Sequence, residues 1–337
     1  MSQRRWIAWA RVTASILVLV VVLRRAHLTS LELDWEASNI AWLTSALVVT
    51  FVAVVLSAVR WQKVLTALGL SARIPTLLRH HLAGLFVSSF LPSTVGGDVL
   101  RVSRLAASNG EAPRTFASVV LERLTGWLVL PVITLVALAI NPGLFGADVN
   151  TRFALVIALV TLGGLAVVLW AAGHPRLGGR LASNAGWRRF TGAVHLGIDR
   201  LRHRPGDVVS VLLSGFAYQL AIVLAAFLAA EALGLDLGPT ALLAFVPAVA
   251  IVQVLPITVG GLGVREGAFA LFLVPLGVPE EKALTLGLVV YGINLVVSLL
   301  GAPAFAWNGR GPGRGEPATA AAAATSTMPQ APSSMTA

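Results

Sequence analysis

The chain of 337 residues contains no cysteine, and Asp, Glu, Lys and Arg make up only 12% of it. The absence of cysteine excludes disulfide frameworks, thiolate metal sites and cysteine nucleophiles. The charged share is about half that of an average soluble domain, which excludes an ordinary cytosolic globular protein. The sequence also lacks a Walker loop, a metal-ligand cluster and a nucleophile elbow. It therefore supports neither ATP-driven transport within this chain nor hydrolysis, and it predicts no enzymatic activity and no cofactor.

Hydrophobic residues are abundant, and Pro and Gly interrupt the apolar stretches that they form. They make up 56% of the chain, the mean hydropathy is +0.82, and 17 Pro and 32 Gly break the apolar stretches. This composition predicts an all-α polytopic membrane protein. Two apolar stretches, 76–91 and 240–255, each run into a Pro followed by a Gly pair, and we interpret them as half-helices that stop within the membrane. Six other segments are long enough to cross a bilayer: 6–23, 40–59, 124–140, 153–172, 208–230 and 283–306.

The net charge of +10 does not indicate a nucleic-acid partner, because no soluble stretch is large enough to fold alone. If both interrupted stretches return to the side they came from, 18 Lys and Arg residues fall on the cytoplasmic side and four fall outside. This bias predicts a multi-pass membrane protein with both termini cytoplasmic. Residues 1–306 form the membrane domain, and 307–337, rich in Gly, Pro, Ala, Ser and Thr, are expected to be a disordered cytoplasmic tail.

One heptapeptide occurs twice, at an offset of 164 residues. LPSTVGG occupies 91–97 and LPITVGG occupies 255–261, and in both copies an Arg follows four residues later, Arg101 and Arg265. The predicted spans obey the same offset. The sequence therefore predicts an internal repeat.

Repeat one covers about 6–140 and repeat two about 153–306, each with three full crossings and one hairpin. Three is an odd number, so the second repeat would be inverted relative to the first, and the two re-entrant hairpins would enter from opposite faces. Inverted repeats with helices broken near the midplane are typical of secondary transporters, with the substrate at the repeat interface. A duplicated scaffold without transport is the alternative.

The hairpin motifs are candidates for binding an anion. Proline ends the incoming half-helix and glycine permits positive φ and close backbone approach. The N–H groups that begin the next half-helix would favour an anion such as a lipid phosphate. A tight turn against a neighbouring helix explains the same residues equally well. The candidate residues are Pro92, Thr94, Gly96, Gly97, Pro256, Thr258, Gly260 and Gly261.

Six ionisable residues lie in or beside these apolar segments: Asp98, Arg101, Glu122, Arg123, Arg265 and Glu266. Glu122 and Arg123 are expected at the mouth of the third span. A charge at the bilayer centre costs roughly 2.5 to 3.5 kcal/mol, so these groups must pair, face inward or meet water. We expect Arg101 and Arg265 to bind the anion, since guanidinium groups match phosphate, and the acids to hold the arginines or take up a coupling proton. A purely structural ion-pair network is the alternative.

Weaker candidates are polar residues within or near the apolar segments. The pair His80 and His81 is expected at the cytoplasmic interface. Tyr218, Gln253 and Asn294 would line the cavity or form interhelical hydrogen bonds.

The motifs resemble the transmembrane region of the lysylphosphatidylglycerol synthase family, also called flippase-like or uncharacterised protein family 0104. The matching residues are Arg60-Trp61, LPSTVGGDVLR at 91–101, LER at 121–123 and LPITVGGLGVREGAF at 255–269. The resemblance implies a flippase-type protein that moves an amphipathic lipid between leaflets. Some relatives carry a soluble aminoacyl-transferase domain after this region, whereas here a low-complexity tail follows, so synthase activity is not inferred.

The resulting hypothesis is an integral membrane flippase for an anionic or polyprenyl- or glycolipid-type lipid, whose partners are membrane lipids. Two alternatives remain. One is a non-catalytic partner of an envelope lipid or glycan synthase. The other is a membrane enzyme with Glu122 or Glu266 as general base, which lacks a visible nucleophile or metal.

Overall fold

The computed structural model describes residues 37–90, 95–144, 149–173, 191–192, 194, 205–254 and 261–307, and all its regular elements in these ranges are helices. The predicted span 6–23 and the tail beyond residue 307 lie outside the described residues.

Five of the helices are long and apolar enough to cross a membrane: α2, α5, α7, α10 and α13. The all-α, multi-pass membrane prediction is thereby confirmed for the described residues. The helices are α2 (Ala37–Ala67), α3 (Ile74–Phe90), α4 (Val95–Asn109), α5 (Ala112–Ile140), α7 (Val149–Gly173), α10 (Pro205–Ala232), α11 (Pro239–Gln253), α12 (Val264–Leu273), α13 (Glu280–Leu299) and α14 (Gly301–Trp307), with a 3₁₀ turn at Val274–Leu276.

Two helices are longer than the apolar runs that predicted them. Helix α2 continues to Ala67, so Arg60 lies inside it and not in a loop. Helix α5 begins at Ala112 and not near 124, which places Glu122 within the helix and not at its mouth. A helix of 31 residues is about 46 Å long, well beyond a hydrocarbon core of about 30 Å. A helix therefore need not end where its apolar run ends.

The start of α5 is fixed by a side chain that precedes it. The Asn109 carboxamide oxygen accepts the backbone N–H of Glu111 at 2.9 Å, and its nitrogen donates to the Thr115 hydroxyl at 3.1 Å. Pro113 stands in the first turn, where its missing N–H costs nothing. These local signals start the helix well before the apolar run.

The predicted last span, 283–306, is two helices. Helix α13 ends at Leu299 and α14 begins at Gly301, and Pro303 has no N–H to donate to the carbonyl of Leu299 across this break. Gly301 then lies against the backbone of Leu82 in α3, and a Cβ at this glycine would overlap the Leu82 carbonyl. The break lets α14 turn and pack on α3.

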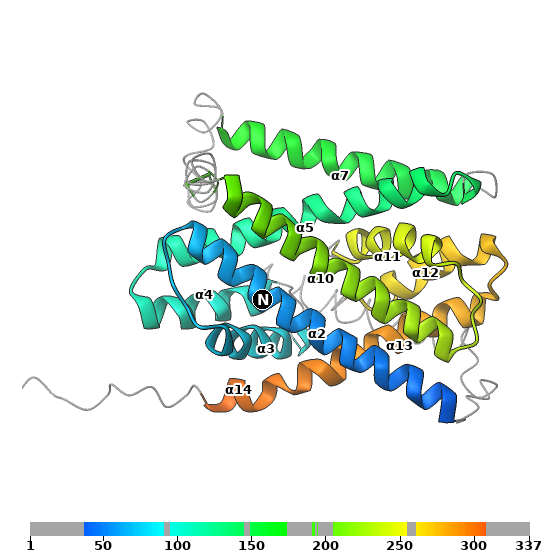
Figure 1. The fold of residues 1–337 in the computed structure, drawn as a ribbon, viewed down its shortest axis with the longest axis horizontal. Coiled ribbons are helices and arrows are strands. Elements are labelled where there is room, and N and C mark those ends of the chain that lie inside the picture. Colours follow the sequence, from blue (N-terminus) through cyan, green and yellow to red (C-terminus); the bar gives the residue numbers. More distant parts are fainter. Residues whose placement is uncertain are drawn as a thin grey trace, which may run out of the picture.

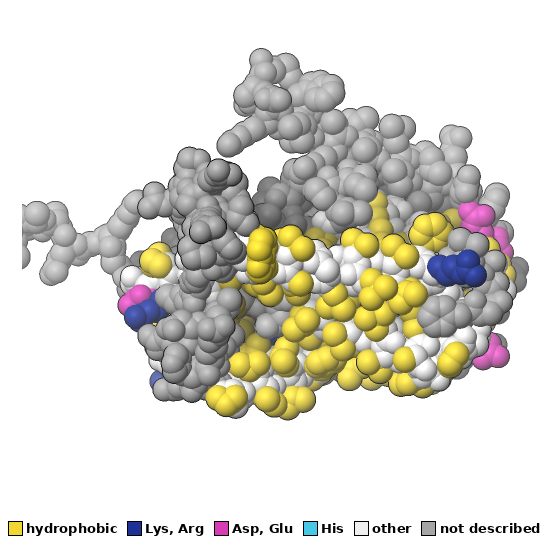
Figure 2. Space-filling model, turned by 90° about the horizontal axis from the view of Figure 1, so that it is seen from above, with side chains coloured by type: hydrophobic (Ala, Val, Ile, Leu, Met, Phe, Trp, Pro, Cys, Tyr) yellow, Lys and Arg dark blue, Asp and Glu magenta, His cyan; other side chains and the backbone are white. Residues whose placement is uncertain are grey.

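Helices α2, α7 and α10 run across much of the view in Figure 1, and α2 packs beside α10 and α5 beside α11. Helices α3 and α4 pack together as a pair, and so do α11 and α12. The Arg104 guanidinium of α4 donates to the carbonyls of Ala304 at 3.0 Å and Phe305 at 2.9 Å, which ties α14 to the first pair. In Figure 2, apolar side chains cover the middle of the face and charged side chains gather at its two ends. This distribution suits a membrane-embedded bundle.

The buried side chains form several groups. The largest lies mainly among α5, α10, α11, α12 and α13, where the rings of Phe245 and Phe272 stack with centroids 5.1 Å apart. A second group surrounds Trp61 and is called the Trp61 cluster below. It consists of Ala58, Trp61, Leu65, Leu77, Leu105 and Val119.

Candidate functional site

A cavity of about 130 Å³ lies inside the bundle, among α2, α3, α4, α5 and α10. We call it the charged cavity, because five ionised side chains line it. They are Arg60, Asp98, Arg101, Glu122 and Arg123, and Ser57, His81, Ser88 and Tyr218 are among the polar neighbours.

Glu122 is the centre of the network. Its side chain is only 3% exposed, and its Oε1 accepts hydrogen bonds from Ser57 Oγ and Arg60 Nη2, both at 3.2 Å. Its Oε2 accepts a hydrogen bond from Arg101 Nη2. One carboxylate from α5 therefore holds a guanidinium from α2 and another from α4.

Asp98 joins the network at its more open side. Arg123 donates to Asp98 Oδ2 through Nε at 2.9 Å and through Nη2 at 2.8 Å, and Arg101 Nη1 lies 3.5 Å from Asp98 Oδ1. The Arg123 side chain is 49% exposed, whereas that of Arg101 is 6% exposed. The charged residues therefore lead from the surface into the bundle.

Aromatic rings hold the two buried arginines in position. The Arg101 guanidinium lies 4.2 Å from the centroid of the Trp61 ring, and Trp61 Nε1 donates to Ser118 Oγ at 2.9 Å. The Arg60 guanidinium lies 4.9 Å from the ring of Tyr218 in α10. Cation–π contacts of this kind strengthen when the groups are shielded from water.

The charges in the cavity do not balance. Three arginines face two carboxylates, which leaves one surplus positive charge. Two of the donors are also unused, because Arg60 Nε and Arg101 Nε are buried without a hydrogen-bond partner. His81 Nδ1 is also buried without a hydrogen-bond partner. Buried polar groups are normally satisfied, so unpaired donors beside surplus positive charge suit an anion.

Glycine in the first motif brings two helices together. A Cβ at Gly97 would overlap the Gly84 carbonyl and the Ser88 hydroxyl, and a Cβ at Gly84 would lie 2.9 Å from Arg101 Cγ. Gly96 and Gly97 both lie within α4, and neither has positive φ. The expected close approach is therefore present at Gly97, but the expected use of positive φ at this pair is wrong. In the second motif, Gly261 has φ of 75°.

The second motif builds a separate group. Arg265 Nε donates to Gln253 Oε1 at 3.0 Å, and the guanidinium lies 5.1 Å from the ring of Tyr291. Glu266 is fully buried and its Oε2 accepts the backbone N–H of Gly263, which caps the start of α12. Its Oε1 is buried without a hydrogen-bond partner. Neither Arg265 nor Glu266 lines the charged cavity, so the six ionisable candidates form two sites and not one.

Some residues have a larger part in the charged cavity, and some a smaller part, than the sequence suggested. Arg60, which follows the predicted span 40–59 directly, was not a candidate site residue, yet it lines the charged cavity. Tyr218 and His81, which were weak candidates, line it too. Asn294 donates to the carbonyl of Val290 in its own helix. Pro92, Thr94, Pro256, Thr258 and Gly260 lie outside the described residues.

No metal site is visible in the described part of the chain, where no three His, Asp or Glu residues gather closely enough to hold an ion. A model of the family described as "Lysylphosphatidylglycerol synthase TM region" matches residues 8–301. The match covers most of the chain, and the chain belongs to this family, which confirms the resemblance seen in the motifs. A comparison with curated proteins finds no match.

Proposed function

We propose that this member of the lysylphosphatidylglycerol synthase transmembrane-region family is a lipid translocator. It moves an anionic lipid, such as a phospholipid or a polyprenyl- or glycolipid-type lipid, between leaflets of the bacterial cytoplasmic membrane, and it has no enzymatic activity of its own. The observation that carries this proposal is the charged cavity, where three arginines face two carboxylates and two guanidinium Nε atoms have no partner.

The energetics favour a headgroup as the occupant. Moving a charged headgroup through hydrocarbon alone is costly, because nothing there replaces its water. In the charged cavity, Arg60 and Arg101 can donate hydrogen bonds to a phosphate, and guanidinium groups suit this anion geometrically. Arg123 is half-exposed and gives the headgroup a first contact, while the acyl chains stay in lipid.

We also propose two inverted repeats with re-entrant hairpins. Adding 164 to the bounds of α3 gives 238–254, against 239–253 for α11. Adding 164 to the end of α4 gives 273, where α12 ends. The pairs α3–α4 and α11–α12 would be the two hairpins, entering from opposite faces. With the positive residues inside, both termini are cytoplasmic.

A lipid-scrambling assay tests the function. The purified protein is reconstituted in liposomes that carry a fluorescent anionic, zwitterionic or polyprenyl-phosphate lipid, and an impermeant reductant reports which molecules reach the outer leaflet. We expect the wild type to move one anionic class. Arg101→Gln should slow the movement at least about tenfold, because the remaining network has no surplus positive charge.

Two further variants keep this test decisive. Arg123→Gln removes a half-exposed arginine of the same cavity and should slow transport without unfolding the protein. Arg114→Gln is the matched control, since Arg114 lies on the same helix in an exposed pair with Glu111 and should leave transport unchanged. If the folded wild type moves no lipid, or if all three variants transport equally, the proposal is wrong, and a role as partner of an envelope synthase takes its place.

A further inference from the structure

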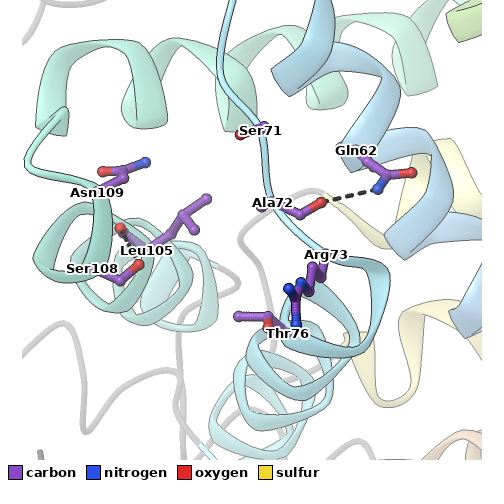
Figure 3. Close-up of a pocket in the computed structure, with 8 residues that line it drawn as sticks. All are labelled: Gln62, Ser71, Ala72, Arg73, Thr76, Leu105, Ser108 and Asn109. Carbon is purple, nitrogen blue, oxygen red and sulfur yellow. Dashed lines mark hydrogen bonds between the residues drawn. The ribbon is translucent and has the colours of Figure 1, made fainter.

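A second cavity lies at one end of the bundle, where the α2–α3 connection meets the end of α4 (Figure 3). We call it the peripheral cavity, and its volume is about 460 Å³. Six polar side chains line it: Gln62, Ser71, Arg73, Thr76, Ser108 and Asn109. Leu105 projects toward it from α4.

The lining of the peripheral cavity selects for negative charge. Arg73 is the one charged residue among its lining residues, and no carboxylate lines it. Hydroxyl groups of Ser71 and Thr76 can donate to an oxyanion, whereas the Ser108 hydroxyl donates to the carbonyl of Leu105 at 2.8 Å. Gln62 Nε2 donates to the carbonyl of Ala72 at 2.9 Å, which holds the α2–α3 connection in place around the cavity (Figure 3).

Helices α2, α3 and α4 contribute to both cavities, yet the cavities share no lining residue. The Trp61 cluster lies between them. Leu105 lines the peripheral cavity and packs in this cluster with Trp61 and Leu77, and the Trp61 ring contacts Arg101 of the charged cavity. Trp61 and Leu77 are fully buried and Leu105 is 3% exposed. One layer of apolar side chains therefore separates two polar cavities.

We infer that the peripheral cavity is an outer binding site for an oxyanion group, and that the Trp61 cluster is the gate between this site and the charged cavity. The inference rests on the proposed function, because it supplies a second route by which a headgroup reaches Arg101, from the end of the bundle, in addition to the open side at Arg123. The oxyanion could belong to a lipid headgroup or to free phosphate, and both have the chemistry that Arg73 and the hydroxyl groups recognise.

Cysteine accessibility tests the gate directly, since the natural chain has no cysteine. Ser88→Cys reports on the charged cavity and Ser108→Cys on the peripheral cavity. Each variant is placed in sealed vesicles whose outer face carries the peripheral cavity, and an impermeant thiosulfonate is added. We expect Ser108→Cys to react and Ser88→Cys to be protected. Adding Leu105→Ala to Ser88→Cys should raise its reaction rate about tenfold or more, because it opens a gap in the layer.

Two controls separate gating from general loosening. Leu138→Ala removes an equally buried leucine from the other large core and should leave the Ser88→Cys rate unchanged. Leu105→Met conserves volume and should keep the gate closed. The gate is overturned if Ser88→Cys reacts from this face without any second change, or if Leu105→Ala and Leu138→Ala have the same effect.

The oxyanion site is tested on Ser108→Cys. An anionic sulfonate reagent should react about threefold faster than a cationic trimethylammonium reagent of similar size, and Arg73→Gln should remove this preference. Phosphatidylglycerol in the vesicle or millimolar inorganic phosphate is then added as competitor. Protection by phosphatidylglycerol alone identifies a lipid headgroup, and protection by inorganic phosphate identifies a free anion.

No protection by either competitor overturns the site. These accessibility readings do not depend on lipid movement. If the cysteine variants behave as expected but the protein moves no lipid, the proposed function is refuted and the gate is not. If the protein moves lipid but Leu105→Ala does not expose Ser88→Cys, the gate is refuted and the proposed function is not.

Discussion

Replacing Glu122 by Gln should destabilise the protein more than any change at a surface ion pair. The carboxylate of Glu122 pairs with Arg60 at 3.2 Å and with Arg101, and all three side chains are less than a tenth exposed. The neutral amide keeps the shape but removes the negative charge, so the surplus in the charged cavity rises from one positive charge to two. Leaving a buried charge without its partner costs about 3 to 5 kcal/mol. The equilibrium constant for unfolding should therefore rise about a thousandfold.

Denaturant titration in mixed micelles, followed by tryptophan fluorescence, measures this change. Glu111→Gln on the same helix is the matched control, because the Glu111–Arg114 pair is exposed and contributes less than about 1 kcal/mol. Adding Arg60→Gln to Glu122→Gln should restore part of the lost stability, with a coupling of about 1 to 3 kcal/mol. A loss below about 1 kcal/mol for Glu122→Gln would refute the reasoning, since it would mean that water already solvates these arginines.

Two further predictions concern close contacts inside the bundle, at Gly287 of α13 and at Trp61 of α2. Gly287→Ala and Gly292→Ala lie on the same helix, but a Cβ at Gly287 would lie 2.9 Å from Glu266 Cα, whereas a Cβ at Gly292 would meet nothing within 4 Å. Thermal unfolding of Gly287→Ala should therefore show a lower midpoint than the wild type. Gly292→Ala should raise the free energy of unfolding by about 0.5 to 1 kcal/mol. Equal effects of the two changes would contradict the close approach at Gly287. Trp61→Phe keeps a ring beneath Arg101 but loses the hydrogen bond to Ser118, so the free energy of unfolding should fall by about 1 to 2 kcal/mol. Adding Ser118→Ala to this variant should lower the free energy of unfolding little further, because the hydrogen bond is already lost.

Apolar runs predicted the five membrane helices of the described residues well, because a span must be long and apolar to exist. They predicted the ends poorly at Arg60 and Glu122, where helices α2 and α5 continue through charged residues. A buried arginine interrupts an apolar run in the sequence but not a helix, provided that a carboxylate from another helix meets it. The apolar residues Val64 and Leu65, just beyond Arg60, were the available sign that α2 continues.

The grouping of the site residues was harder to predict than their identity. Asp98, Arg101, Glu122 and Arg123 come together as expected for a charged network. Arg265 occupies the position equivalent to Arg101 in the repeat, yet its partners are Gln253 and Tyr291. The identical spacing in the two motifs determines the local backbone conformation. The partners of each arginine depend on the helices that pack against its motif. The helices that pack against the two motifs differ, and the sequence offset does not show the difference.

The close contact of Gly84 with Gly97 joins two helices that both line the charged cavity. Because no side chain separates the two glycines, α3 and α4 touch through their backbones, and a larger residue at Gly97 would push the helices apart. Two ion pairs, Arg101–Glu122 and Arg123–Asp98, join α4 to α5. On the translocator function proposed above, an anion that binds these two arginines would compete with both ion pairs, so binding of the lipid would itself loosen the contact of α4 with α5.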